Sequence, residues 1–356
     1  MNIEKRKPEL LIPAGDLETL KIAVMYGADA IYIGGDMYGL RAKARNFSMN
    51  DMRKGIAFAH DYGKKVYVTS NITAHNRDLA GIRAYFRELM AFGKDKPDAL
   101  IISDPGVFMI AKEEAPDIDI HISTQANNTN YATFKFWYNH GATRVVSARE
   151  LSLDEIAELR QNIPEDMEIE TFVHGAMCIA YSGRCLLSNY FTGRDANLGE
   201  CTHSCRWKYH IVEEKRPGEF LPIEENERGT YIFNSKDLCM VEYIPELVNA
   251  GINSFKVEGR MKTALYVATV AGTYRRAIDD YFTDPKLYEK NKPAYMEEVS
   301  KGVNRQFTTG FFFGKPNHKD QIYEKNTYEK AYTYLGTIIG VREGMYCLEQ
   351  KNKFFV

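Results

Sequence analysis

The chain has 356 residues, and its 44 % hydrophobic and 12 % aromatic content suffices for one large α/β domain with additions or for two to three ordinary domains. Lys and Arg number 46 against 48 Asp and Glu, which gives a formal net charge of −2. This balance excludes a positive field over the whole surface, so an RNA partner would have to be held by a local basic patch.

Neither a membrane span nor an export signal is evident in the sequence. No apolar run approaches the roughly 18–20 residues that a bilayer span needs. The first residues, MNIEKRKPELLIPAGD, carry charge without the apolar core of a secretory signal. We therefore expect a soluble cytoplasmic protein with no membrane contact. In that reducing compartment, clustered cysteines favour metal or redox chemistry over disulfides.

A strand followed by a helix recurs from the N-terminus. The strand segments are β-branched and almost continuously apolar, as parallel strands buried on both faces are. They lie within 8–16, 26–35, 62–71, 96–106, 117–125, 140–150, 167–175 and, much later, 250–260. The first helix is expected from about Leu17 to Tyr26, with Asp16 as N-cap and Gly27 as its stop. Eight such strands predict a TIM-like (β/α)8 barrel, with a doubly wound sheet as the alternative.

The carboxyl ends of barrel strands form one functional rim. The residues expected at this rim are Asp16, Gly35, Asn71, Asp104, Gln125, Arg149, His174 and Glu258. Several of them could instead cap the following helix. For Asp16 and Asp104, capping is the favoured interpretation.

The strand–helix periodicity ends after His174. We assign the α/β barrel to 1–175 and 230–282, and a cysteine-rich insertion to 176–229. Residues 231–239 are expected to form a further strand that returns Cys239 to the insertion. Whether this strand belongs to the barrel wall is left open.

The last part of the chain is expected to leave the barrel. Ala264–Tyr281 is predicted to be a helix, with Leu265, Ala268, Ala271 and Ile278 on its buried face. Residues 283–325 are interpreted as a polar connector that ends in an aromatic turn, FTTGFFFGKP, packed against the barrel. Residues 326–356 alternate like strands and are expected to start a small C-terminal β domain that continues past the last residue given.

Four cysteines lie within Cys178–Cys205, and a fifth is Cys239. Only Cys201 and Cys205 have the close spacing of a zinc knuckle, and ferredoxin-type C-x2-C-x2-C runs are absent. The long, irregular spacing favours a site whose ligands come from separate loops, which suits an iron–sulfur cluster. On spacing alone, zinc and catalytic or inert thiols remain open.

Three segments carry a resemblance to a known family. ETFVHGAMCIAYSGRCLLS (170–188), LIPAGDLETLKIAVMYGADAIYIG (11–34) and KVEGRMK (256–262) resemble the peptidase U32 family, and the resemblance covers essentially the whole chain. The segments NLGECTHSCR and FNSKDLC are most similar to the branch that hydroxylates tRNA. The family was once regarded as collagenase-like peptidases.

The resemblance implies a [4Fe-4S] cluster held by Cys178, Cys185, Cys201 and Cys239, with Cys205 as the alternative fourth ligand. It also implies hydroxylation of a wobble uridine in the tRNA anticodon loop to 5-hydroxyuridine, with prephenate as the hydroxyl source. Because relatives elsewhere in the family work as pairs, a second U32-family subunit is a possible partner.

Candidate residues for this chemistry lie at strand ends. Prephenate is a dianion, and Arg149 and Arg260, supported by Lys262, are candidates to bind its carboxylates. His174 and Glu258 are the candidate catalytic residues for proton exchange. The alternatives are ion pairs of the arginines with Glu150 and Glu258, and a His174 that packs in the core or bonds to a cluster sulfur.

A short stretch after the cysteines combines rings and cations. Arg206, Trp207, Lys208 and Tyr209 are the candidate RNA contacts, because rings stack on unpaired bases and cations bind phosphates. An ordinary amphipathic strand would show the same alternation.

Three rival functions remain open on the sequence. A U32-type peptidase would have to use a Cys178–His174 dyad, since HExxH and GxSxG motifs are absent. The others are an iron–sulfur scaffold subunit of a hydroxylase complex and a zinc-stabilised RNA-binding module.

Overall fold

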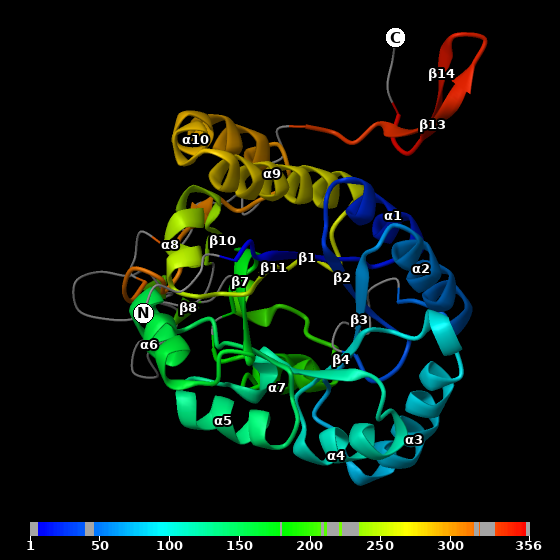
Figure 1. The fold of residues 1–356 in the computed structure, drawn as a ribbon, viewed down its shortest axis with the longest axis vertical. Coiled ribbons are helices and arrows are strands. Elements are labelled where there is room, and N and C mark those ends of the chain that lie inside the picture. Colours follow the sequence, from blue (N-terminus) through cyan, green and yellow to red (C-terminus); the bar gives the residue numbers. More distant parts are fainter. Residues whose placement is uncertain are drawn as a thin grey trace.

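The computed structural model describes residues 6–39, 46–178, 180–207, 210–211, 221–222, 235–316, 320 and 332–353. Eight parallel strands close into a barrel with helices around it (Figure 1). These strands are β1 (Glu9–Pro13), β2 (Ala30–Gly34), β3 (Lys65–Ser70), β4 (Ala99–Ile102), β5 (Asp119–Ile122), β6 (Arg144–Val146), β7 (Glu168–Gly175) and β11 (Ser254–Val257). Because β11 pairs with both β1 and β7, the ring is complete, and the predicted (β/α)8 barrel is confirmed.

Helices form the outer layer. They are α1 (Leu17–Met25), α2 (Met49–Asp61), α3 (Asn76–Met90), α4 (Pro105–Glu114), α5 (Tyr131–Asn139), α6 (Leu153–Asn162), α8 (Ile244–Asn249) and α9 (Ala264–Thr283). Asp16 accepts a hydrogen bond from the Thr19 amide at 2.8 Å, and Asp104 accepts one from the Val107 amide at 2.9 Å. Both aspartates therefore cap helices, as the favoured interpretation held.

The cysteine-rich insertion follows β7 directly. Its described part contains α7 (Leu187–Thr192) and the short strands β8 (His210–Ile211) and β9 (Leu221–Pro222), which pair antiparallel. The predicted strand that returns Cys239 is β10 (Asp237–Cys239), while 231–234 lie outside the described residues. It pairs antiparallel with β7 and parallel with β12 (Phe307–Thr308), so it extends the sheet beside the barrel and is not part of the closed wall.

Part of the stretch interpreted as a polar connector is helical. Helix α10 (Pro285–Ser300) packs on α9 and buries Tyr288 and Tyr295. The aromatic turn places Phe312 in the core, as expected. The antiparallel pair β13 (Gly336–Arg342) and β14 (Met345–Gln350) projects away from the barrel in Figure 1 and forms the expected small C-terminal sheet.

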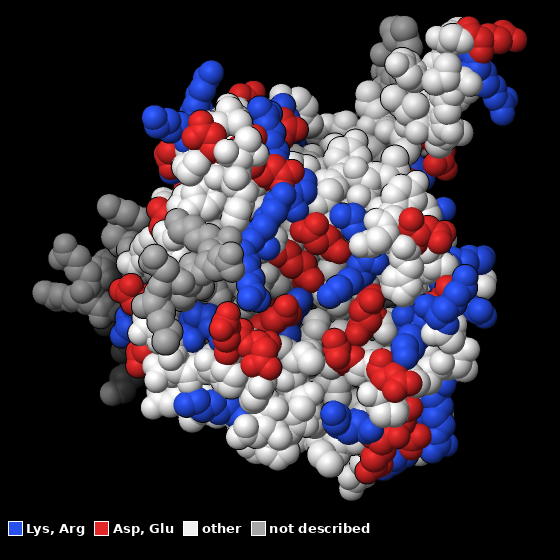
Figure 2. Space-filling view, in the orientation of Figure 1, with Lys and Arg blue, Asp and Glu red and all other residues white. Residues whose placement is uncertain are grey.

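Charge is mixed over the surface in view. On the face shown in Figure 2, Lys and Arg side chains are interspersed with Asp and Glu, as the net charge of −2 leads one to expect. Among the described residues, every helix is too short or too polar to span a bilayer.

Candidate active site

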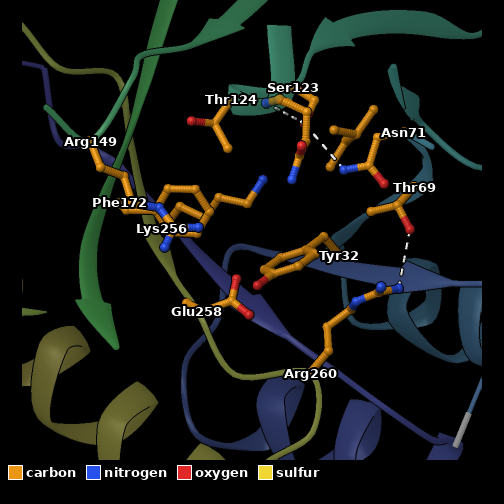
Figure 3. Close-up of a pocket in the computed structure, with 12 residues that line it drawn as sticks. Tyr32, Thr69, Asn71, Ser123, Thr124, Arg149, Phe172, Lys256, Glu258 and Arg260 are labelled. Atoms are coloured by element: carbon orange, nitrogen blue, oxygen red, sulfur yellow. Dashed lines mark hydrogen bonds between the residues drawn. The ribbon is translucent and has the colours of Figure 1, made fainter. Parts of the chain in front are cut away.

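A pocket of about 440 Å³, counting its mouth open to solvent, lies at the carboxyl end of the barrel (Figure 3). Its walls come from inward-facing strand residues and from the first residues after the strands. They are Tyr32, Thr69, Asn71, Ile101, Ser123, Thr124, Gln125, Arg149, Phe172, Lys256, Glu258 and Arg260. Active sites of TIM-barrel enzymes lie at this end, so the pocket is the candidate site.

Among the described residues, three cations line the pocket. Arg149 stacks 4.1 Å from the Phe172 ring centre and donates to the Ala176 carbonyl at 2.7 Å, yet its buried Nε has no hydrogen-bond partner among the described residues. Lys256 lies 4.5 Å from the Tyr32 ring centre, and Arg260 donates to Thr69 at 3.1 Å. Three positive groups between two aromatic rings favour a ligand with carboxylates and a planar or ring-shaped body.

Arg260 reaches the pocket because β2 ends in glycine. A Cβ atom at Gly34 would overlap the Arg260 guanidinium and come within 3.0 Å of the Thr69 hydroxyl. The missing side chain therefore makes room for the cation, which is 6 % exposed.

Glu258 is the one carboxylate among the pocket-lining residues that the structure describes. Its side chain points into the pocket in Figure 3. Its amide donates to the His174 carbonyl at 2.8 Å, and its carbonyl accepts from Tyr266 at 2.9 Å, so its backbone is held on both sides. Across the pocket, Asn71 donates to Ser123 at 3.1 Å, which fixes a polar wall.

Below the pocket, the barrel interior is an ion-pair network. Lys256 donates to Glu170 at 2.6 Å, and Glu170, 0 % exposed as a side chain, also pairs with Arg144 at 3.2 Å. Arg144 continues to Glu9 at 2.6 Å. Burial, reinforced by the charges of Arg144 and Lys256, holds the pKa of nearby His121 well below its usual value, so that ring stays neutral. The network fixes Lys256 from beneath.

His174 lies outside the pocket lining. It is 2 % exposed, and its ring packs near Tyr266, Tyr274 and Phe307 at centroid distances of 5.5–5.9 Å. Burial lowers its pKa to about 4 although Asp237 acts in the opposite direction. The structure thus places this candidate base in a closed aromatic environment, and the Glu258 amide, which donates to the His174 carbonyl, connects it to the pocket.

The remaining candidates are dispersed. Lys262 donates to the Val303 carbonyl at 3.3 Å and lies over Tyr266, away from the pocket lining. Trp207 is 45 % exposed and 6.0 Å from the Phe191 ring. Lys208, Tyr209 and the Arg206 side chain lie outside the described residues. Four of the predicted rim residues do line the pocket, and all four follow strands that the sequence identified. They are Asn71, Gln125, Arg149 and Glu258.

Several pocket residues were not predicted. Tyr32, Phe172 and Lys256 point into the barrel from within strands. The available signal was a ring or a charge at an inner position of an otherwise apolar strand, such as Lys256 in SFKV.

The cysteines are at the same end of the barrel but are not assembled. Cys239 is buried in register with His174, and burial raises the pKa of its thiol to about 12. Cys178 is exposed, and Cys185 and Cys201 are partly exposed. Among the described residues, no three His, Cys, Asp or Glu side chains are arranged to hold a metal ion. As placed, the thiols do not fit a bound cluster.

Comparison with known proteins gives the family. The sequence model of peptidase family U32 matches residues 15–322. The chain belongs to the peptidase U32 family. It is 43 % identical to "tRNA hydroxylation protein P1" of Bacillus subtilis over 98 % of this chain and 82 % of that protein. It is 40 % identical to "tRNA hydroxylation protein P" of Escherichia coli over 98 % and 84 %.

A third relative acts on a different RNA. The chain is 37 % identical to the "23S rRNA 5-hydroxycytidine C2501 synthase" of Escherichia coli, over 89 % of this U32 chain and 49 % of that protein. The three names share hydroxylation of RNA. The resemblance drawn from residues 170–188 is confirmed.

Proposed function

We propose that this protein is an RNA hydroxylase that converts a tRNA wobble uridine to 5-hydroxyuridine. The names of its relatives support tRNA as the substrate, and the anticodon loop is the natural target because its bases are already unpaired. The observation that carries the proposal is the cationic, ring-walled pocket at the catalytic end of the barrel.

We propose prephenate as the co-substrate of this pocket. Arg149, Lys256 and Arg260 would bind its two carboxylates, since charge-assisted hydrogen bonds from guanidinium groups suit planar anions. Tyr32 and Phe172 would contact its ring. Glu258, as the carboxylate among the described pocket residues, would exchange a proton with the bound substrate.

We also propose that Cys178, Cys185, Cys201 and Cys239 bind a [4Fe-4S] cluster. Support comes from the family motif and from the position of β10. Leu238 precedes Cys239, and Met177 precedes Cys178. The side chains of Leu238 and Met177 both approach Gly310, within 3.4 Å of where its Cβ atom would be. Two of the four cysteines therefore adjoin residues that are close together. Assembly would require the insertion to bring its thiols closer than they lie in this structure.

The deciding experiment is mass spectrometry of bulk tRNA nucleosides from a strain that lacks this gene. We expect loss of 5-hydroxyuridine derivatives and their return with the wild-type gene. Anaerobically purified protein should contain about four iron and four sulfide per chain, and Cys178→Ala should lower both. Unchanged nucleosides in the deletion strain would contradict the substrate. Peptide hydrolysis that survives iron removal would favour the peptidase, and a requirement for a second protein would favour the scaffold.

The pocket makes its own prediction at Gly34. In Gly34→Ala the new methyl group must displace the Arg260 guanidinium. We expect hydroxylation to fall about tenfold, because that factor corresponds to the free energy of one charge-assisted hydrogen bond. Complementation by Gly34→Ala, read out as 5-hydroxyuridine, measures it. Gly340→Ala is the matched control, because a Cβ atom there meets nothing within 4 Å. Full activity of Gly34→Ala would show that Arg260 does not need this position.

A further inference from the structure

The cysteine-rich insertion exposes a contiguous apolar surface. Leu186, Tyr190, Phe191 and Trp207 are 66 %, 82 %, 44 % and 45 % exposed, respectively. The Tyr190 and Phe191 rings lie 5.1 Å apart, and Phe191 lies 6.0 Å from Trp207. Leu186 and Tyr190 are four residues apart, on one side of the α7 turn. We name these four residues the aromatic patch.

The polarity of this segment is inverted. Ser188 and Ser204 are each 2 % exposed, while the neighbouring rings face solvent. A hydroxyl chain runs inside, with Ser188 and Thr202 joined at 3.0 Å and Thr202 and Ser204 at 2.9 Å. This chain links α7 to the turn before Trp207. Folding alone would bury the rings and expose the hydroxyls, so this segment presents an apolar surface to solvent.

The insertion is attached to the pocket rim. Asn127, just after the pocket residue Gln125, donates to the Ser182 carbonyl at 2.8 Å and accepts from Arg184 at 2.7 Å. On the other side, the Thr73 amide donates to the Asn197 carbonyl at 3.2 Å. A Cβ atom at Gly183 would overlap the Gln125 side chain. The segment that carries the aromatic patch therefore contacts the pocket's edge at two loops.

We infer that the aromatic patch stacks unpaired RNA bases next to the nucleotide that enters the pocket. This inference rests on the proposed function and names the surface that binds its substrate. Every base has a π-face, so exposed rings bind single strands with little sequence preference. Exposed Arg184, which donates to the rim residue Asn127, supplies a cation for the backbone, and Arg194 comes two residues after the end of α7.

The test measures RNA binding apart from catalysis. The probes are a fluorescent ten-nucleotide single strand with a central uridine and the same strand in a duplex, with the full protein. Tyr190→Ala should weaken single-strand binding about fivefold to tenfold, and Tyr190→Ala with Trp207→Ala further. Tyr190→Phe should retain the affinity, because it keeps the ring. Tyr62→Ala is the matched control. Tyr62 is 59 % exposed, and it lies between the end of α2 and the start of β3, at the amino end of the barrel strands and opposite the pocket.

Each outcome decides the inference. A higher Kd of the Tyr190→Ala variants for the single strand, with the Kd of Tyr62→Ala unchanged, supports the inference. An unchanged Kd in the double variant overturns it, as does an equal loss on duplex, which offers no free base faces along its length. If the variants lose self-association in sedimentation while RNA binding stays, the patch is a protein interface and the inference fails. Normal 5-hydroxyuridine levels together with unchanged RNA binding in the variants would reject the role of the aromatic patch and leave the proposed function standing. Weaker RNA binding in the variants of a protein that hydroxylates no tRNA would reject only the proposed function.

Discussion

Arg260→Met should lower hydroxylation about 100-fold and leave the protein folded. Arg260 is buried at the pocket wall and is placed by Thr69 and by the space over Gly34. If it binds a carboxylate through two charge-assisted hydrogen bonds, their loss costs about 3 kcal/mol in transition-state stabilisation, which is about 100-fold in rate. The measurement is kcat/KM for prephenate with purified protein and unmodified tRNA.

Three variants separate binding from folding in this experiment. Arg260→Lys keeps a charge but not the planar fork, so it should recover only part of the activity. Lys256→Met should also lose activity, although it leaves Glu170 with Arg144 alone and so should lower stability as well. Arg276→Met, an exposed arginine on α9 that pairs with Asp280, is the control. Activity of Arg260→Met equal to that of the control would exclude a direct role for Arg260.

Much of the site was predictable because the ends of the barrel strands can be recognised in the sequence. A β-branched apolar run that stops at a polar residue places that residue at the barrel's carboxyl end, and this logic found Asn71, Gln125, Arg149 and Glu258. Lys256, Tyr32 and Phe172 were not found. In a closed barrel, alternate strand positions face the interior or the helices, and both are buried, so the sequence shows no alternation that separates them.

The helices show a similar limit. Ala264–Tyr281 was predicted as a helix and is observed as Ala264–Thr283. Ala271 and Ile278 are buried as expected, but Leu265 and Ala268 are only partly buried. The buried face of α9 is instead centred on Tyr266 and Tyr274, which donate to the barrel carbonyls of Glu258 and Val173. Helix α10 packs along α9 and covers its last turns, where Tyr281 and Tyr288 have ring centres 5.8 Å apart. A polar, proline-containing sequence did not indicate that neighbour, since Pro285 sits harmlessly in the first turn and only Pro293 lies inside the helix.

For the cysteines, the sequence predicts a cluster site that the structure does not show assembled among the described residues. Spacing and family motif predict four ligands, and that assignment stays a prediction. Three of the four lie in an insertion held to the rim by a few hydrogen bonds, whereas Cys239 is fixed in the sheet. Thiolate ligands gain their binding energy only with metal present, so the positions of the loops that carry them depend on that metal.

Arg144→Met should give the largest loss of stability. Arg144 pairs with Glu9, Glu168 and Glu170 inside the barrel, and its neighbours join β1, β6, β7 and β11. Removing one partner of a buried ion pair costs about 3–5 kcal/mol, because the remaining carboxylates stay desolvated. Urea unfolding at pH 7 measures the loss. Arg87→Met is the control, since Arg87 makes an equally close pair with Glu114 on the exposed surface and should hardly change the midpoint.

The pH dependence identifies the cause of that loss. Burial alone would raise the pKa of Glu9, but Arg144's charge and hydrogen bonds, with those of Tyr67 and Ser254, outweigh it and hold the pKa below 4.5. In the wild type, Glu9 therefore adds stability above about pH 4.5, and this is lost as pH falls through its folded pKa. Without Arg144, burial dominates and the pKa rises above 4.5. The variant's deficit should then shrink from pH 7 to pH 5, where the buried carboxyl can be protonated. A deficit that is constant over this range would mean that lost packing of the Arg144 side chain, and not an unpaired carboxylate, destabilises the barrel.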